Sequence, residues 1–279
     1  MAGQISTIRR QLKSVRSTQK ITNAMSLVST AKLQKQRVRM EENNIYSEEF
    51  HTMLLSALAG MGEKDRDNVY FKPRNVNNPL HIIITSNSGL CGSYNMDLLR
   101  YVEKNVNKMD PIFAIGSYGI KWLDSNNYMV IKRFDELADL EPAVINKLID
   151  NSLELYRRGE ISKFDIIYTQ YVNTLTFTPA TYELLPLDVP KEVEERPVEF
   201  APDLQTVLDN LIPEYISAIV YSTFLEARTS EHAARRSAMD SANKNAQSLI
   251  DEISLKLNQA RQASITQEVN EITAGADAL

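Results

Sequence analysis

The chain has 279 residues, of which 43% are apolar, and its formal net charge is −5. This apolar content is enough for a buried core, and no run of 18 or more apolar residues offers a membrane span, so we expect a soluble protein with one large or two ordinary domains. The single cysteine, Cys91, excludes a disulfide within the chain, and residues 1–15 lack the apolar core of a signal peptide. Both features favour the cytoplasm.

Residues 4–59 contain neither glycine nor proline, and the same is true of residues 214–274. Gaps of 56 and 61 residues without a helix breaker predict two long helices. Each would be roughly 85–90 Å long, whereas a compact middle domain has a radius of gyration of about 14 Å. Helices of this length project beyond such a domain, and we therefore expect them to pack on each other.

The two long segments also show the spacing of a coiled-coil seam. Apolar residues recur at three- and four-residue steps in Ile5, Ile8, Leu12 and Val15, and near the other end in Leu249, Ile253, Leu257 and Ala260. In residues 19–36 the same register passes through Thr22, Ser26 and Ser29, while Ile21, Met25 and Val28 form a second stripe. We therefore expect the seam to drift. An ordinary two-helix hairpin with irregular seams is the alternative.

Charge is distributed unevenly, because residues 1–40 contain nine Lys or Arg and no Asp or Glu. A solvated helix face is the ordinary explanation, and a docking surface for an acidic partner is the sharper one. Nucleic acid is disfavoured because the first aromatic residue is Tyr46 and the last is Phe224, so neither end offers a ring for base stacking.

The middle of the chain alternates predicted strands and helices. The strands are 80–85, 111–116, 129–134 and 164–172, with a further hairpin strand at 176–184, and the helices are 95–107, 117–126 and 143–158. This order predicts an open, mostly parallel, Rossmann-like sheet. Residues 186–202 carry four prolines and five carboxylates, which predicts an exposed acidic connection. Asp203 is expected to cap the last helix, and Pro213 to kink it.

The fold class is therefore α plus α/β, a long antiparallel coiled coil of the two end helices with a central open α/β domain. Residues 1–60 form the first coiled-coil helix, residues 61–200 the α/β domain with its acidic connection, and residues 201–279 the last coiled-coil helix.

The loop SNSGLCGSYN, residues 86–95, is the best candidate for chemistry. A glycine loop after a strand can cradle phosphate, but this one matches neither the dinucleotide-binding motif nor the P-loop, and a tight turn packed on the sheet is the preferred interpretation. The histidines His51, His81 and His232 have no metal-ligand spacing. We expect no cofactor, no metal and no catalytic residue.

Three blocks together resemble the gamma subunit of the F-type (rotary) ATP synthase, and the match spans the chain. They are IRRQLKSVRSTQKITNAMSLVSTAKL at 8–33, IITSNSGLCGSYN at 83–95, and the segment from TSEHAARRSAM to the end at 229–279. The middle block reads SNSGLCG where the family usually has SDRGLCG, so Asn87 and Ser88 stand in place of an ion-pairing Asp-Arg.

The resemblance implies a non-catalytic rotor subunit of a bacterial type. The two end helices would form an axle with its tip inside a ring of three alpha and three beta subunits. The α/β domain and the foot of the axle would meet the epsilon subunit and the membrane-embedded c-ring. The chain would couple ion flow to ATP synthesis or hydrolysis from the cytoplasmic face of the bacterial cell membrane, as a peripheral protein. A non-rotary coiled-coil scaffold and a nucleotide-binding enzyme built on the middle domain are the rival hypotheses.

The resemblance also implies contacts with the alpha and beta subunits. By motif match they fall on Met25 in KITNAM, Arg235 in EHAAR, and Gln262 and Thr266 in RQASIT. The basic stretch 9–39 gains a candidate partner in an acidic loop of the beta subunits.

Overall fold

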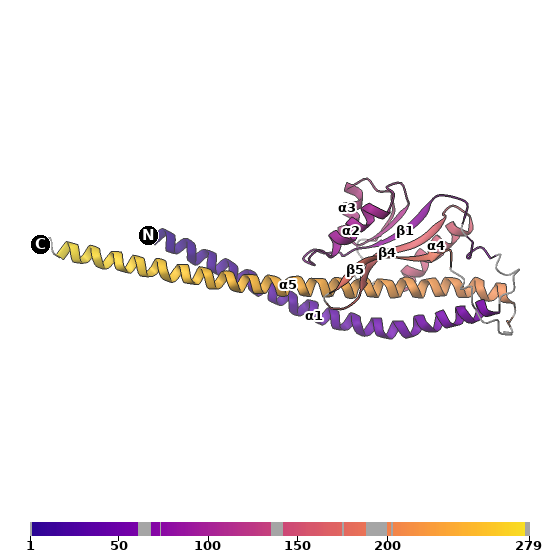
Figure 1. Cartoon of the computed structure of the whole chain (residues 1–279), viewed down its shortest axis with the longest axis horizontal. Helices are drawn as coiled ribbons and strands as arrows, with labels where there is room; N and C mark the ends of the chain where they lie inside the picture. The colour runs from indigo at the N-terminus through magenta and orange to yellow at the C-terminus, as the bar shows by residue number, and fades with distance from the viewer. Residues whose placement is uncertain are drawn as a thin grey trace. The chain divides into compact units, whose positions relative to one another are not determined.

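The computed structural model describes residues 2–60, 68–72, 74–134, 142–174, 176–187, 200–201 and 203–276. They form two compact units: unit 1 combines Met1–Thr30 with Arg235–Leu279, and unit 2 is Ala31–Ala234. Two long helices, α1 (Ala2–Ala59) and α5 (Leu204–Ala276), contribute to both units (Figure 1). The two predicted long helices are confirmed. The functional division of the chain at residues 60 and 200 stays a prediction.

Unit 2 contains a five-stranded sheet with the order β3-β2-β1-β4-β5. The strands are β1 (Pro79–Ile84), β2 (Ile112–Ile115), β3 (Val130–Phe134), β4 (Lys163–Tyr171) and β5 (Phe177–Leu185). The first four are mutually parallel, and β5 runs antiparallel to β4. The predicted parallel sheet with an added hairpin strand is therefore confirmed.

Helices cover both faces of this sheet, which explains why β1 and β2 read as continuous apolar runs. On one face, α2 (Tyr94–Asn105) and α3 (Ser117–Ser125) pack on alternate strand residues such as Ile83. On the other face, Ile82 and Ile84 share a core with α4 (Pro142–Arg157), the end of α1 and the first part of α5. The parts of α1 and α5 that belong to unit 2 thus contribute to the hydrophobic core of the α/β domain.

The helices α1 and α5 pair in antiparallel fashion within unit 1. Gln19 Nε2 donates to Gln247 Oε1 at 2.9 Å, Thr22 Oγ1 donates to Asn243 Oδ1, and Ser26 Oγ donates to Asp240 Oδ1 at 2.6 Å. The residue numbers of these partners rise along α1 as they fall along α5, so the two helices run in opposite directions. In unit 2 the same direction is seen, because Ser222 contacts Asn44 and His51 stacks on Tyr215.

The seam of α1 does not drift, so that prediction is wrong. Thr22 is half-buried and Ser26 and Ser29 are buried, whereas Ile21 is 59% exposed and Val28 is 55% exposed. The polar residues stay in the seam because the hydroxyls of Thr22 and Ser26 find acceptors on α5. A rotation of α1 that turned Ile21, Met25 and Val28 into the seam would remove these hydrogen bonds and leave polar groups unpaired.

One seam position on α5 was also wrongly predicted. Leu249 is 47% exposed, and the next residue, Ile250, is buried instead. The observed inward face of α5 runs through Ala246, Ile250, Ile253 and Leu257, at steps of four, three and four residues. This spacing keeps a regular heptad, whereas two successive four-residue steps from Leu249 would leave it.

The polar layer at Ser26 is expected to stabilise the helix pair. Replacing Ser26 by alanine removes a buried donor to Asp240 and should lower the free energy of unfolding by about 1 kcal/mol, measured by urea denaturation of the purified chain. Thr30→Ala is the matched control, because the Thr30 hydroxyl bonds only to the backbone oxygen of Ser26 in its own helix. Equal losses for both variants would contradict a role for the cross-helix bond.

The start of α5 is capped as predicted. The backbone N–H of Thr206 donates to Asp203 Oδ1 at 2.8 Å, and this bond, together with the Thr206 hydroxyl, lowers the pKa of the Asp203 carboxyl. Pro213 lies inside α5, and the helix continues through it. Most of the predicted acidic connection at 186–202 lies outside the described residues.

Candidate partner-binding surfaces

The four residues assigned to partner contacts all belong to unit 1, but they differ in exposure. Gln262 and Thr266 are exposed, and they lie one turn apart on α5, where the Thr266 hydroxyl donates to the Gln262 backbone oxygen at 3.0 Å. Met25 is half-buried beside the seam. Arg235 is buried, with 7% of its surface exposed. Gln262 and Thr266 therefore form one small surface.

Met25 and Arg235 do not lie at the same level of the helix pair. The bond between Ser26 and Asp240 fixes the level of Met25 on α5, and Arg235 is five residues away from Asp240 along that helix. Five residues correspond to about 7.5 Å of helix.

Large apolar side chains remain exposed along both helices of unit 1. On α1 they include Leu27, which is 66% exposed, and on α5 they include Ile272, which is 73% exposed. Ile265, Val269 and Ile272 recur at four- and three-residue spacing and thus share one face of α5. A row of exposed apolar side chains on one helix face, as at Ile265, Val269 and Ile272, is a candidate binding surface. The full set is Ile21, Leu27, Val28, Leu249, Leu255, Ile265, Val269 and Ile272.

The N-terminal part of α1 also carries a basic face. Arg9, Lys13, Arg16 and Lys20 line a hollow of about 470 Å³. Their side chains make no hydrogen bond or ion pair with any residue that the structure describes. Four unpaired cations on one helix face favour an acidic partner, which agrees with the interpretation of the charge pattern in residues 1–40.

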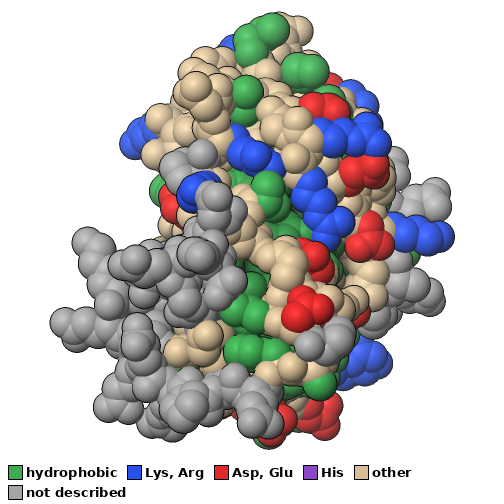
Figure 2. Space-filling model, turned by 90° about the vertical axis from the view of Figure 1, so that its right-hand side faces the viewer, with side chains coloured by type: hydrophobic (Ala, Val, Ile, Leu, Met, Phe, Trp, Pro, Cys, Tyr) green, Lys and Arg blue, Asp and Glu red, His purple; other side chains and the backbone are tan. Residues whose placement is uncertain are grey.

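The face of the molecule seen in Figure 2 has a different character. Lys and Arg side chains are interspersed with Asp and Glu side chains, and apolar side chains show between them (Figure 2). A mixed face of this kind is typical of an ordinary solvated surface.

Side chains in and next to the glycine loop accept hydrogen bonds from backbone N–H groups at the ends of the neighbouring elements. The backbone N–H of Ser86 donates to Asn95 Oδ1 at 3.0 Å, and the N–H of Ser117, at the start of α3, donates to Asn87 Oδ1 at 3.3 Å. The N–H of Gly119 donates to Thr85 Oγ1 at 2.9 Å. The backbone N–H groups of Ser86, Ser117 and Gly119 are therefore already paired and are not available to a phosphate. Asn87, which replaces an aspartate of the family pattern, has a structural role here.

The loop and the sheet hold the middle of α5. The Tyr94 hydroxyl donates to the backbone oxygen of Ala227 at 3.1 Å, and the N–H of Tyr171 donates to Glu226 Oε1 at 3.0 Å. Burial raises the pKa of the Glu226 carboxyl, and the hydrogen bonds from Tyr171 and Tyr168 oppose this shift. Within unit 2, α5 is therefore attached to the α/β domain by polar bonds as well as by apolar packing.

A buried ionic cluster in the sheet was missed by sequence reasoning. His81 on β1 and Asp165 on β4 are register partners, and His81 Nδ1 lies 2.6 Å from Asp165 Oδ1. His81 Nε2 lies 3.4 Å from Asp110 Oδ2, and Lys163 Nζ lies 3.7 Å from Asp165 Oδ2. One ionisable residue in each of two apolar segments, LHIII and FDIIY, was the available signal.

No group of three or more His, Cys, Asp or Glu side chains suited to a metal ion is present in the described ranges. The same ranges contain no helix with the length and apolar character needed to cross a membrane.

Comparison with known proteins places these features in a family. The ATP synthase family model matches residues 4–279. The ATP synthase gamma chain of Clostridium kluyveri is 35% identical over 280 residues, covering 98% of this chain and 97% of the relative. That of Mycoplasma mycoides subsp. mycoides SC is 36% identical over 280 residues, with 97% of each chain covered.

Solved structures show the same fold at lower identity. A chain of the Euglena gracilis mitochondrial ATP synthase, from the OSCP/F1/c-ring structure, superposes with a TM-score of 0.71 at 17% identity, covering 100% of this chain and 95% of that one. A chain of the Tetrahymena thermophila mitochondrial ATP synthase central stalk and c-ring gives 0.61 at 20% identity, with 80% and 99% covered.

Proposed function

Since the chain belongs to the ATP synthase gamma chain family, we propose that it is the central-stalk rotor subunit of an F-type ATP synthase. In this role it turns inside a ring of three alpha and three beta subunits and couples ion flow through the membrane c-ring to ATP synthesis or hydrolysis. The chain is part of an enzyme complex, and in this proposal its own residues carry no catalytic step. It lies on the cytoplasmic side of the bacterial cell membrane, contacts the membrane only through the c-ring, and also binds the epsilon subunit.

The observation that carries this proposal is the exposed apolar surface of unit 1. A helix pair alone in water would bury its large apolar side chains, yet the seam contains hydroxyls, and Ile21, Leu27 and Val28 are exposed. Such a surface suits a helix pair surrounded by partner subunits. The unpaired basic face formed by Arg9, Lys13, Arg16 and Lys20 adds charge complementarity to an acidic partner loop.

The asymmetry of the helix pair explains how its rotation acts on the catalytic sites. Two paired helices have no threefold symmetry, so they present a different face to each of three surrounding catalytic sites. Each site is then held in a different conformation, and turning the helix pair changes the conformations in sequence. In this mechanism residues 1–60 and 201–279 act as the axle, and residues 61–200 as the foot that receives torque from the c-ring.

Direct observation of rotation tests the proposal. Met109 is 73% exposed and Cys91 is buried, so Met109→Cys gives one accessible thiol on this chain for a visible probe. With the alpha–beta ring of the complex fixed to a surface, the probe should turn in steps when ATP is added and stop when ATP is removed. A probe that stays still while the complex hydrolyses ATP would refute the rotor role.

A non-rotary scaffold is not favoured by the family membership. It would also require self-association of this chain, whereas a rotor is present once per complex. Native mass spectrometry of the purified complex gives the number of copies directly.

Contacts of Met25, Arg235, Gln262 and Thr266 with the alpha and beta subunits are part of the proposal. Replacing Met25 by lysine should leave the complex assembled but reduce the ion pumping obtained per ATP hydrolysed. The reason is that the lysine ammonium would make new polar contacts with the alpha and beta subunits. It would also lose its hydration at each rotational step of the helix pair. Pumping and ATPase rates in the same membrane vesicles measure this ratio.

Asn23→Lys is the matched control for Met25→Lys. Asn23 is exposed and lies on the opposite flank of the seam from Met25. The Asn23→Lys variant therefore adds the same charge within one turn of α1 but on a different side of the helix. An equal loss of coupling in both variants would indicate a general charge effect and remove the assignment of Met25.

A further inference from the structure

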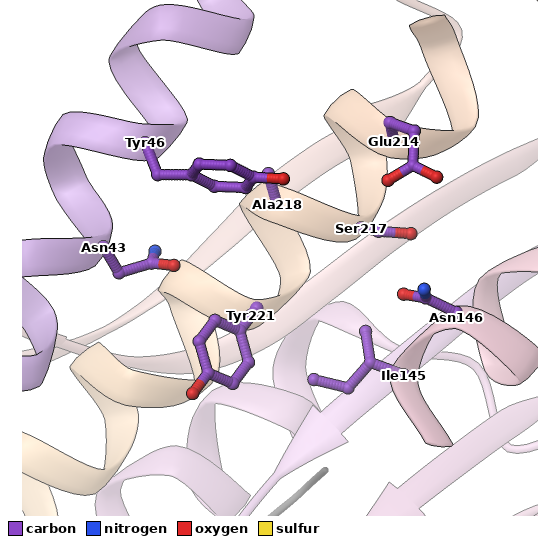
Figure 3. A pocket seen from close by; sticks show the side chains of 8 residues that line it. All are labelled: Asn43, Tyr46, Ile145, Asn146, Glu214, Ser217, Ala218 and Tyr221. Carbon is purple, nitrogen blue, oxygen red and sulfur yellow. The ribbon is translucent and has the colours of Figure 1, made fainter. Parts of the chain in front are cut away.

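A pocket of about 290 Å³ opens on unit 2 where three helices meet. Its floor is α5, with Glu214, Ser217, Ala218 and Tyr221 on one face of that helix. Tyr46 of α1 lies on one side and Asn146 of α4 on the other (Figure 3). The partner contacts assigned in unit 1 do not include this pocket.

Three oxygen-bearing side chains gather at one end of the pocket. Figure 3 shows the carboxylate of Glu214, the hydroxyl of Ser217 and the amide of Asn146 on the same side, from two different helices. None of the three side chains makes a hydrogen bond or ion pair within the described part of the chain. Three acceptors that line the same side of one pocket match the three donors of an ammonium group better than the planar fork of a guanidinium.

The rest of the pocket suits the stem of a lysine. Glu214 and Tyr221 are seven residues apart on α5, which is about 10 Å along the helix axis. This length accommodates an extended lysine side chain, whose methylene groups would lie on Ala218 and the Tyr221 ring. Lysine side chains commonly bury the stem on apolar surface and keep the ammonium on polar groups.

The surrounding helices add charge complementarity. Residues 41–63 of the chain contain Glu41, Glu42, Glu48, Glu49 and Glu63 but no Lys or Arg, and residues 203–227 contain Asp203, Asp209, Glu214 and Glu226 but no Lys or Arg. These are the segments that supply the α1 and α5 walls of the pocket. The charged residues of α1 are all basic over residues 1–40, so the charge of this helix reverses along its length. The acidic half attracts a basic partner.

We propose that this pocket receives a lysine side chain of another protein subunit, with the ammonium on Glu214, Ser217 and Asn146. The occupant is a protein partner rather than a free amine, because a single carboxylate on an open surface holds an isolated ammonium only weakly. A lysine side chain of a docked subunit is also held in place by the rest of the subunit interface, so a weak contact of the ammonium group is sufficient. The inference rests on the proposed function in that it requires a multisubunit assembly.

Zero-length cross-linking of the intact complex tests the contact. A carbodiimide joins a carboxylate to an amine only when the two touch, so the Glu214 peptide should be recovered linked to a lysine peptide of another subunit. Glu48 and Asp150 are exposed carboxylates on the same walls but do not line the pocket, and they serve as internal controls. Cross-links at Glu48 or Asp150 as frequent as those at Glu214 would overturn the proposal, as would a link from Glu214 to Lys147 of its own chain.

A second variant keeps the test decisive if carbodiimide coupling fails. Ser217→Cys, treated with a short thiol-to-amine linker, should capture the same foreign lysine, because Cys91 is buried and does not compete. Adding Glu214→Gln should lower this capture about tenfold, the effect of losing one charge-assisted hydrogen bond. Asn151→Cys, exposed on another face of α4, is the control.

Capture by the Ser217→Cys variant that equals capture by the Asn151→Cys control, or that is insensitive to Glu214→Gln, would refute the lysine site. Subunit composition, read from the same samples, separates this result from failure of the proposed function. A complex that lacks alpha and beta subunits would contradict the rotor role, whereas an intact complex without the cross-link contradicts only the pocket.

Discussion

Replacing Asp165 by asparagine is expected to lower the free energy of unfolding of this chain by about 3 kcal/mol near pH 6, the usual loss when one partner of a buried ion pair is removed. Asp165 and His81 are both almost completely buried, and their side chains are 2.6 Å apart. Asparagine has a similar shape but no charge, so the imidazolium would lose its main counter-ion. Urea denaturation of the purified chain measures the difference.

The same cluster makes stability depend on pH. Burial alone would lower the pKa of His81, but the hydrogen bonds and charges of Asp165 and Asp110 outweigh it, and the pKa is raised above the ordinary value of 6.5. A raised pKa in the folded state means that folding favours proton binding. The contribution of His81 is therefore full below pH 6.5 and is lost as pH rises through the raised value.

The free energy of unfolding of the wild type should accordingly fall as pH rises above 6.5 and through the raised pKa of His81. This part of the fall should be reduced in Asp165→Asn. Asp110→Asn is the matched control, because Asp110 is more exposed and lies 3.4 Å from the other ring nitrogen. The Asp110→Asn substitution should lower the free energy of unfolding by about 1 kcal/mol. If wild type and Asp165→Asn show the same pH profile, His81 is not held protonated by this pair.

Replacing Gly116 by alanine is expected to destabilise the α/β domain by about 3–5 kcal/mol. Gly116 ends β2 with a φ of +96°, and a Cβ there would lie 2.3 Å from the backbone oxygen of Thr85. A backbone atom at the end of a buried strand cannot move aside, and backbone strain adds to the overlap. Thermal unfolding of the purified chain should show a large decrease in Tm.

Gly159→Ala separates these two causes. Gly159 also has a positive φ, +72°, but no atom lies within 4 Å of its added Cβ. The Gly159→Ala variant should lose about 1–2 kcal/mol of its free energy of unfolding, because alanine disfavours the left-handed backbone conformation at this position. Equal losses at both positions would show that the overlap with Thr85 is relieved at little cost.

Much of the fold could be predicted because its signals are local and strong. Two segments without glycine or proline predicted α1 and α5, and the apolar runs around Ile82 and Phe113 predicted strands covered on both faces. The cap at Asp203 also followed from residue type and position. Each of these features depends on the backbone preferences of neighbouring residues, which a sequence displays directly.

The seam could not be predicted correctly because apolar periodicity does not distinguish a core from a binding surface. Ile21, Met25 and Val28 look like an inward stripe, but the hydroxyls of Thr22 and Ser26 have acceptors on α5 more than 200 positions away in sequence. Leu249 and Ile250 are equally apolar neighbours, and only the partner helix determines which of them is buried.

The candidate sites differ in their origin. Met25, Arg235, Gln262 and Thr266 came from the family resemblance, since no local chemistry singles them out. The basic face of α1 came from composition. The lysine pocket and the cluster of His81, Asp165 and Asp110 needed three-dimensional structure, because each joins elements that lie far apart along the chain.

The polar layers between α1 and α5 have a mechanical consequence. If torque or tension displaced one helix by a heptad, Gln19 would leave Gln247 and Ser26 would leave Asp240, and the buried Ser26 hydroxyl would lose its acceptor. A uniformly aliphatic interface would meet similar contacts after such a step and resist it less. These hydrogen-bonded layers therefore fix the axial alignment of the two helices, so that an applied twist is passed along the pair instead of being lost to slippage.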